Sequence, residues 1–155
     1  MERMVCQAVA ACFGTIAFSI FFRVPAKHFP TCGGIGAVAW IVYLVIFDVY
    51  KRNMAAVFLA SLTVVLLSRF FSVRHKCPLI SYLIPGIFPL VPGTGIYFTV
   101  YAAISGEYMQ AVASFVSAFK GGFAIAIAVV GGIIIPTRYI VWLNGRLQWR
   151  KKPGK

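Results

Sequence analysis

A run of prolines and glycines interrupts the apolar segment of residues 78–105, and this run limits what the chain can fold into more than any other feature. The interrupting residues are Pro85, Gly86, Pro89, Pro92, Gly93 and Gly95. Proline lacks a backbone N–H and clashes with the preceding helical turn, while glycine permits conformations outside the helix. Backbone groups left unpaired in hydrocarbon cost several kcal/mol each, so such a segment is tolerated where protein buries it or where it lines a water-filled cavity.

The composition is that of an integral membrane protein. Of the 155 residues, 61% are hydrophobic and 12% are charged, with a mean hydropathy of +0.88; a soluble domain carries about 25% charged residues. Five apolar blocks are each close to the ~20 residues that span a bilayer core of ~30 Å. They cover residues 4–22, 33–50, 54–71, 78–105 and 109–135. We predict an all-α membrane bundle of about five transmembrane helices, with the fourth span broken.

Lysine and arginine gather on one side of these five spans. Eleven fall on that side: Arg23, Lys27, Arg69, Arg74, Lys76, Arg138, Arg146, Arg150, Lys151, Lys152 and Lys155. The other side has Arg3, Lys51 and Arg52. Because cytoplasmic loops are enriched in basic residues, we predict a multi-pass protein of the cell membrane with a cytoplasmic C-terminus and an external N-terminus.

We expect one transmembrane domain over residues 1–136 and a basic cytoplasmic tail over residues 137–155. Trp142 and Trp149 place aromatic rings among the basic residues of this tail. Tryptophan prefers the headgroup level and basic residues prefer anionic lipid, so the tail is expected to lie at the membrane interface.

Several function classes are disfavoured by the residues. The net charge of +12 falls between and after apolar blocks, without the basic and aromatic platform of a nucleic-acid site. The four cysteines form no CxxC pair, so we expect free thiols and no metal site. No nucleophile elbow, carboxylate pair or phosphate loop is present. We therefore expect no enzyme activity, no cofactor and no nucleic-acid partner.

The broken segment is the strongest candidate site. We expect the helix to restart after Pro92, with Thr94 as its N-cap and the N–H groups of residues 95–97 partly free. A helix N-terminus at membrane depth attracts anions. The predicted substrate pathway comprises Pro85, Gly86, Pro89, Pro92, Gly93, Thr94, Gly95, Tyr97, Ser114, Ser117 and Lys120. The alternative is a structural kink that brings helices close together without contacting a ligand.

Lys120 lies near the centre of the fifth block. A charge at this depth is costly and is expected to face the bundle interior or a cavity. Ser114 and Ser117 recur at helical spacing beside it. The alternative is that the span slides and Lys120 reaches an interface.

Other polar residues favour plain interpretations. Asp48 precedes Lys51 and Arg52 near the end of the second block, so an interfacial salt bridge is expected. His28 and His75 are expected in solvated loops. The glycines that open the second block, at positions 33, 34 and 36, indicate a close-packing helix face.

Residues 84–97 read Ile-Pro-Gly-Ile-Phe-Pro-Leu-Val-Pro-Gly-Thr-Gly-Ile-Tyr. This run resembles the signature of the threonine/serine exporter family, in its C-terminal membrane half. Pro25 to His28, the glycine-rich stretch of residues 33–40, and the Lys-Gly pair opening residues 120–132 are similar in order and spacing. The resemblance covers nearly the whole chain and brings no residue-level mechanism with it.

The resemblance implies a five-span half-transporter in its split form, whose other half is a second membrane subunit. It also implies export of threonine and serine, or of dicarboxylates such as succinate. Our first hypothesis is therefore a membrane subunit of a secondary transporter that exports small carboxylate-bearing solutes. A structural subunit that stabilises a partner and an oligomeric channel are the alternatives, and a homo-oligomer stays open.

Overall fold

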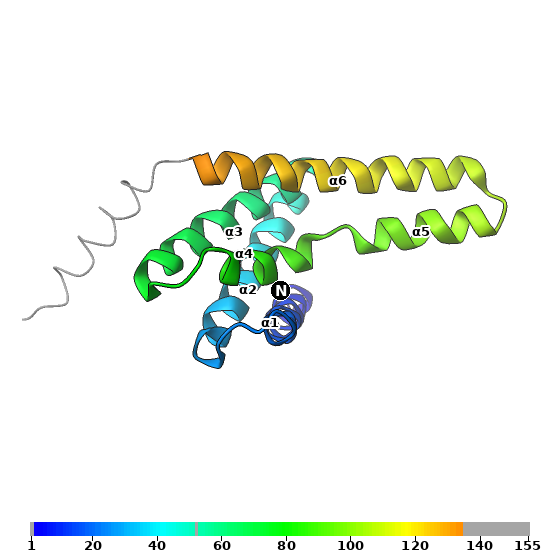
Figure 1. The fold of residues 1–155 in the computed structure, drawn as a ribbon. Helices are drawn as coiled ribbons and strands as arrows, with labels where there is room; N and C mark the ends of the chain where they lie inside the picture. The colour runs from blue at the N-terminus through cyan, green and yellow to red at the C-terminus, as the bar shows by residue number, and fades with distance from the viewer. Residues whose placement is uncertain (1, 52, 135–155) are drawn as a thin grey trace, which may run out of the picture.

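Every regular element in the described part of the chain is a helix (Figure 1). The computed structural model describes residues 2–51 and 53–134. The long helices are α1 (Glu2–Phe21), α2 (Phe29–Tyr50), α3 (Asn53–His75) and α6 (Tyr108–Ile134). The shorter helices are α4 (Ile80–Ile87) and α5 (Gly93–Ile104), and the 3₁₀ turns are η1 (Ala26–His28) and η2 (Phe88–Leu90). The predicted tail over residues 137–155 lies outside the described residues.

Within residues 2–51 and 53–134, four helices, α1, α2, α3 and α6, are long and apolar enough to cross a membrane. The segments Ile80–Leu90 and Gly93–Ile104 qualify only as a pair, and they are bent by 47° at the break between them. The chain is thus a multi-pass helical membrane protein with four or five spans, and the predicted all-α fold with a broken fourth span is confirmed.

Basic residues in the left-handed region follow three of the helices. Arg23, Lys51 and Lys76 have φ of 54°, 51° and 53°. After α1, the N–H of Val24 donates to the carbonyl of Ser19 at 3.0 Å. This hydrogen bond reaches back from residue 24 to residue 19 and satisfies a carbonyl that the helix itself leaves unpaired. The positive side chains also suit the negative end of the helix dipole, so the helices end close to where the apolar blocks end.

The core lies between α2, α3 and α4. Ile35, Val64 and Tyr82 are almost fully buried there. Gly86 lets α4 approach closely, because a Cβ at this position would come within 2.9 Å of a methyl carbon of Val64 and 3.0 Å of one of Ile35. The first half of the broken span is therefore embedded in the bundle.

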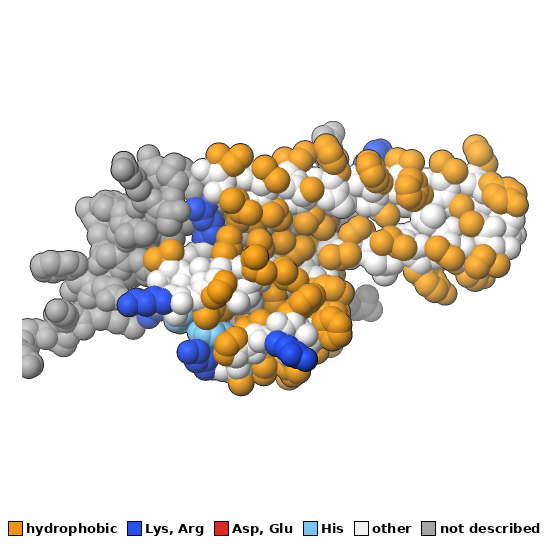
Figure 2. Space-filling view, in the orientation of Figure 1, with side chains coloured by type: hydrophobic (Ala, Val, Ile, Leu, Met, Phe, Trp, Pro, Cys, Tyr) orange, Lys and Arg blue, Asp and Glu red, His pale blue; other side chains and the backbone are white. Residues whose placement is uncertain are grey.

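The second half of the broken span is held differently. α5 packs against α6, and α6 packs against α3. In Figure 1, α5 and the adjacent part of α6 extend as an antiparallel hairpin beyond the other helices. We name α5 and residues 108–120 of α6 the hairpin arm. Hydrophobic side chains cover much of the face of this arm shown in Figure 2, so lipid or another protein must cover it.

Arg69 joins α3 to α6. Arg69 is 8% exposed, and its guanidinium donates to the carbonyl oxygens of Gly132 at 2.6 Å and Ile133 at 2.9 Å. In the sequence, Pro136 stands four residues after Gly132 and has no N–H to offer that carbonyl. The interpretation of Arg69 as a flanking loop charge was wrong: it is a buried residue of α3 that satisfies carbonyls near the end of α6.

Candidate functional site at the helix break

The break is a short stretch of non-helical backbone between η2 and α5. Val91 is extended, and Pro92 is the N-cap of α5 with φ −75° and ψ 56°. No side chain caps this helix end. The prediction of Thr94 as N-cap was therefore wrong. α5 begins at Gly93 directly after Pro92, which puts Thr94 inside the first helical turn.

Few backbone hydrogen bonds cross the break. The N–H of Val91 donates to Phe88, that of Gly93 to Val91 at 2.7 Å, and that of Ile96 to Pro92 at 3.2 Å. Within the described residues, these bridging bonds use neither the carbonyls of residues 89 and 90 nor the N–H groups of residues 94 and 95. Two carbonyl acceptors and two N–H donors are thus without a backbone hydrogen-bond partner in one short segment, as expected where helices end.

A cavity of about 180 Å³ adjoins these groups. We name it the break cavity. Its lining comes from α2, the start of α3, η2, the break, the start of α5 and α6: Trp40, Tyr43, Asn53, Val57, Pro89, Leu90, Val91, Pro92, Thr94, Gly95, Ser117 and Ala118. The hydroxyl of Tyr43 donates to the Asn53 Oδ1 at 3.0 Å. Drug-sized ligands need about 300–1,000 Å³, so this cavity suits a smaller solute.

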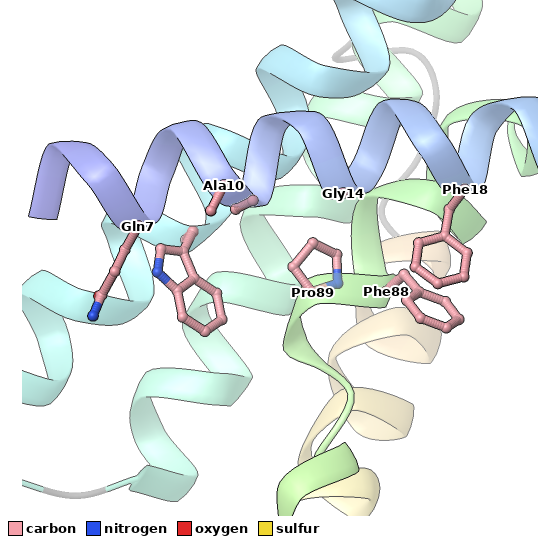
Figure 3. Close-up of a pocket in the computed structure, with 8 residues that line it drawn as sticks. Gln7, Ala10, Gly14, Phe18, Phe88 and Pro89 are labelled. Carbon is pink, nitrogen blue, oxygen red and sulfur yellow. The ribbon is translucent and has the colours of Figure 1, made fainter.

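A second cavity, of about 330 Å³, lies on the α1 side of the break. In Figure 3, Gly14 and Phe18 of α1 lie across from Pro89 and Phe88, and Gln7 lies farther along the same helix. The rings of Phe18 and Phe88 stack. We name this hollow the α1 cavity.

Trp40 and Pro89 line both cavities. The indole Nε1 of Trp40 is buried and has no hydrogen-bond partner among the described residues. A buried N–H without an acceptor costs about 1–3 kcal/mol. The Trp40 donor therefore stands unsatisfied on a side chain shared by the two cavities.

The structure brings together five of the predicted pathway residues in the break cavity: Pro89, Pro92, Thr94, Gly95 and Ser117. It separates the others. Pro85 and Gly86 are buried in the core, Ser114 is half-buried on α6, and Gly93 and Tyr97 are exposed. The pathway role of these residues remains a prediction.

Lys120 is exposed on α6. The expectation that it faces the interior of the bundle is therefore not met within the described part of this chain. It follows Ser117 by three residues, so the two occupy neighbouring positions on the helix surface. Any interior that Lys120 faces must be formed in part by another molecule.

Two expectations outside the break have clear outcomes. Asp48 is exposed and accepts a hydrogen bond from the Lys51 Nζ at 2.7 Å, which confirms the predicted ion pair. The interpretation of His28 as a solvated loop residue was wrong, because it is 4% exposed. His75, the last residue of α3, is exposed but bonded to Tyr82.

Sequence reasoning missed Trp40, Tyr43 and Asn53 as cavity residues. Trp40 and Tyr43 sit within a block that is apolar on all sides, so periodicity does not distinguish their face. Asn53 opens α3 and reads as an ordinary loop residue. Only the polar tips of Trp40 and Tyr43, which need partners when buried, offered a hint.

In many membrane transporters, solutes bind where a transmembrane helix is interrupted. This chain has such an interrupted span, with a cavity on each side of the break. Residues 7–135 match the model of a family described as threonine/serine exporter, ThrE, and the chain belongs to this family. The resemblance seen in the sequence is thereby confirmed, and the family is one of membrane transporters. The comparisons gave no match to a curated protein and none to a solved structure.

Proposed function

We propose that this chain is one membrane subunit of a secondary transporter that exports small amino acids such as threonine and serine. One observation carries the proposal: within the described residues, no backbone hydrogen bond uses the N–H groups of residues 94 and 95 or the carbonyls of residues 89 and 90, and all four residues line one cavity. A carboxylate accepts hydrogen bonds and an ammonium donates them. An amino-acid zwitterion carries both groups and can satisfy both sets.

The side chains around the cavity suit the same substrates. Thr94 and Ser117 place hydroxyl groups on the cavity wall. They can exchange hydrogen bonds with the hydroxyl of threonine or serine, and Trp40 adds an unsatisfied N–H donor. A dicarboxylate such as succinate has no ammonium. Its second carboxylate would meet the carbonyls of residues 89 and 90, so we rank it below the amino acids.

The packing of the two half-spans supports a hinge at the break. α4 is embedded against α2 and α3, whereas α5 packs on α6. A change in the 47° bend would move α5 relative to α4 and alter the wall shared by the two cavities. Alternating access in transporters uses rigid-body motions of this kind.

The hairpin arm supports the need for a second membrane subunit. Phe115, Phe119 and Lys120 are exposed on α6. Lipid accepts the two aromatic side chains but not a mid-span cation. We propose that the other half of the exporter covers this face and gives Lys120 a polar environment. A second copy of this chain would serve the same purpose and is the alternative outcome. The cell membrane and the cytoplasmic C-terminus remain part of the proposal.

The test is efflux of labelled threonine, serine and succinate from cells that express both halves, or either half alone. We expect threonine and serine efflux with both halves and only background with one. Efflux from cells with this chain alone would favour a homo-oligomer. No efflux with both halves present at normal levels would overturn the proposed function.

A further inference from the structure

Two histidines, a tyrosine and a cysteine form a hydrogen-bonded chain at the end of the bundle opposite Asp48. The Tyr82 hydroxyl lies 2.7 Å from the Nδ1 of His28 and 2.8 Å from the Nδ1 of His75. The Nε2 of His28 lies 3.2 Å from the Cys77 Sγ. These four residues come from η1, α3, the α3–α4 turn and α4, so only the fold brings them together.

The chain runs from the surface into the core. His75 is exposed, whereas His28 is 4% exposed and Tyr82 is fully buried. The imidazole rings stack with centroids 5.3 Å apart. In Figure 2, histidine surface is seen beside lysine and arginine side chains at this end of the molecule. The outer histidine can therefore exchange protons with water while the inner one cannot do so directly.

The hydroxyl of Tyr82 has one proton and stands between two ring nitrogens. It can donate to one imidazole only, so the other imidazole must donate to the tyrosine oxygen. With both rings neutral, two arrangements meet these requirements. In the one that can take up a proton at the surface, His75 carries its proton on Nδ1 and His28 carries its proton on Nε2. The Nε2 of His75 is then a free base.

We propose that His75, Tyr82 and His28 form a proton-binding relay, and that the proton it holds is the ion coupled to export. A proton from water binds the Nε2 of His75. The Nδ1 proton of His75 passes to the Tyr82 oxygen, and the Tyr82 proton passes to the Nδ1 of His28. One proton has entered, His75 is neutral again, and His28 is the cation.

The charges around the relay are basic, and the other titratable groups are thiols. Those on the adjoining elements are Lys27 on η1, Cys32 on α2, Arg74 beside His75 on α3, and Lys76 and Cys77 in the α3–α4 turn. The acidic residues of the chain are elsewhere: Glu2 opens α1, Asp48 is near the end of α2 and Glu107 follows α5. In the described part of the chain, no carboxylate stands beside the relay to hold the His28 cation in an ion pair, so the bound proton can be released again.

The relay is connected to the break through α4. Tyr82 lies on the same eight-residue helix as Pro85 and Gly86. Ser81, next to Tyr82 on α4, is held to α2, because its carbonyl oxygen accepts a hydrogen bond from the thiol of Cys32 at 3.7 Å. Proton transfer through the relay reverses the donor and acceptor roles at the Tyr82 hydroxyl, and so changes the hydrogen bonds that hold the start of α4 to His28 and His75. α4 leads through η2 into the break. This part of the inference rests on the proposed function; proton binding does not.

Proton binding is tested first on the full-length chain in lipid nanodiscs, labelled with ¹⁵N-histidine. The chain has two histidines, so the spectrum reports only these rings. When the pH is lowered from about 8 to about 5, we expect the signals of the two rings to shift together and His28 to become cationic. In Tyr82→Phe we expect them to shift independently. Independent titration in the wild type, or a His28 that stays neutral throughout, would overturn the relay.

Coupling is tested with both exporter halves in proteoliposomes. Exchange of labelled for unlabelled threonine needs no net proton movement, whereas uphill transport driven by a pH gradient does. We expect Tyr82→Phe to keep exchange and to lose uphill transport by roughly 5- to 150-fold, the range of ordinary coupling free energies. Tyr101→Phe, the same change at an exposed residue of α5, should alter neither.

The outcomes separate the two proposals. Wild-type uphill transport in Tyr82→Phe would overturn the coupling role of the relay. A wild-type complex that exchanges neither threonine nor serine would overturn the proposed function, and the nitrogen spectra would still decide whether the relay binds a proton.

Discussion

The Arg69 guanidinium donates to the carbonyl oxygen of Gly132 at 2.6 Å, and this bond ties the middle of the bundle to the end of α6. A Cβ at Gly132 would overlap the side chain of Val65, so the two helices meet here without room for a larger residue. The last turn of α6 is thereby fixed to α3, while the hairpin arm at the other end of α6 extends past the bundle.

Loss of the Arg69 guanidinium should destabilise the protein. Arg69→Ala leaves buried carbonyls of α6 without their donor, and hydrogen bonds to charged groups contribute about 1.5–3 kcal/mol. We expect a lower thermal unfolding temperature in detergent and less protein in the membrane. Arg74→Ala, at an exposed arginine of the same helix, is the matched control and should change neither. Equal stability of the two variants would contradict the account of Arg69.

A side chain at Gly95 should impair export by crowding the break cavity. A Cβ there would lie 2.9 Å from the Cβ of Ala118. We expect Gly95→Ala to lower threonine efflux and the double variant Gly95→Ala/Ala118→Gly to restore it, because the second change returns the lost space. Gly122→Ala, where a Cβ would meet nothing within 4 Å, serves as the control. Efflux from Gly95→Ala equal to that of the wild type would argue against close α5–α6 contact at this point.

The charge of Lys120 should be needed for export but not for assembly. Lys120→Gln should reduce threonine efflux strongly while the second subunit still co-purifies with this chain. Lys120→Arg keeps the charge at the same position and should retain most of the efflux. If Lys120→Gln exported threonine at the wild-type rate, Lys120 would be removed from the mechanism.

The hydroxyl of Thr94 should contribute to substrate affinity. Thr94→Val keeps the shape of the side chain and removes one hydrogen bond, which contributes about 0.5–1.5 kcal/mol. We expect the half-saturating threonine concentration to rise by up to about tenfold, with unchanged protein levels. In Thr63→Val, the hydroxyl removed is bonded to the Leu59 carbonyl of its own helix, and transport should not change. A similar effect of both variants would mean that Thr94 acts through stability alone.

The fold could be predicted largely from the sequence because its main determinants are local. Each span is an apolar run, and Pro89 and Pro92 interrupt the fourth run, whereas Pro85 lies within α4. The cap of α5 was misplaced at Thr94 because the Pro92–Gly93 pair begins the helix immediately, which a side-chain preference for caps does not reveal.

The candidate site could be predicted only in part because its geometry depends on distant contacts. His28 reads as a loop residue until α4 brings Tyr82, 54 positions away in the chain, to its imidazole. Trp40 and Asn53 reach the break cavity for the same reason. Lys120 was expected to face inward because a mid-span charge must be satisfied, and that argument does not say whether the same chain or a partner supplies the surroundings.

In the proposed function, the break recognises both the carboxylate and the ammonium of an amino acid. The decisive measurement is competition with labelled threonine exchange in proteoliposomes that contain both exporter halves. The competitors are serine, a 3-hydroxy acid that lacks the ammonium, and an amino alcohol that lacks the carboxylate. We predict that serine competes and that each analogue competes at least about tenfold more weakly, because each leaves one pair of backbone groups at the break without a partner. Competition by the hydroxy acid equal to that by serine would contradict the assignment of the break as an amino-acid site.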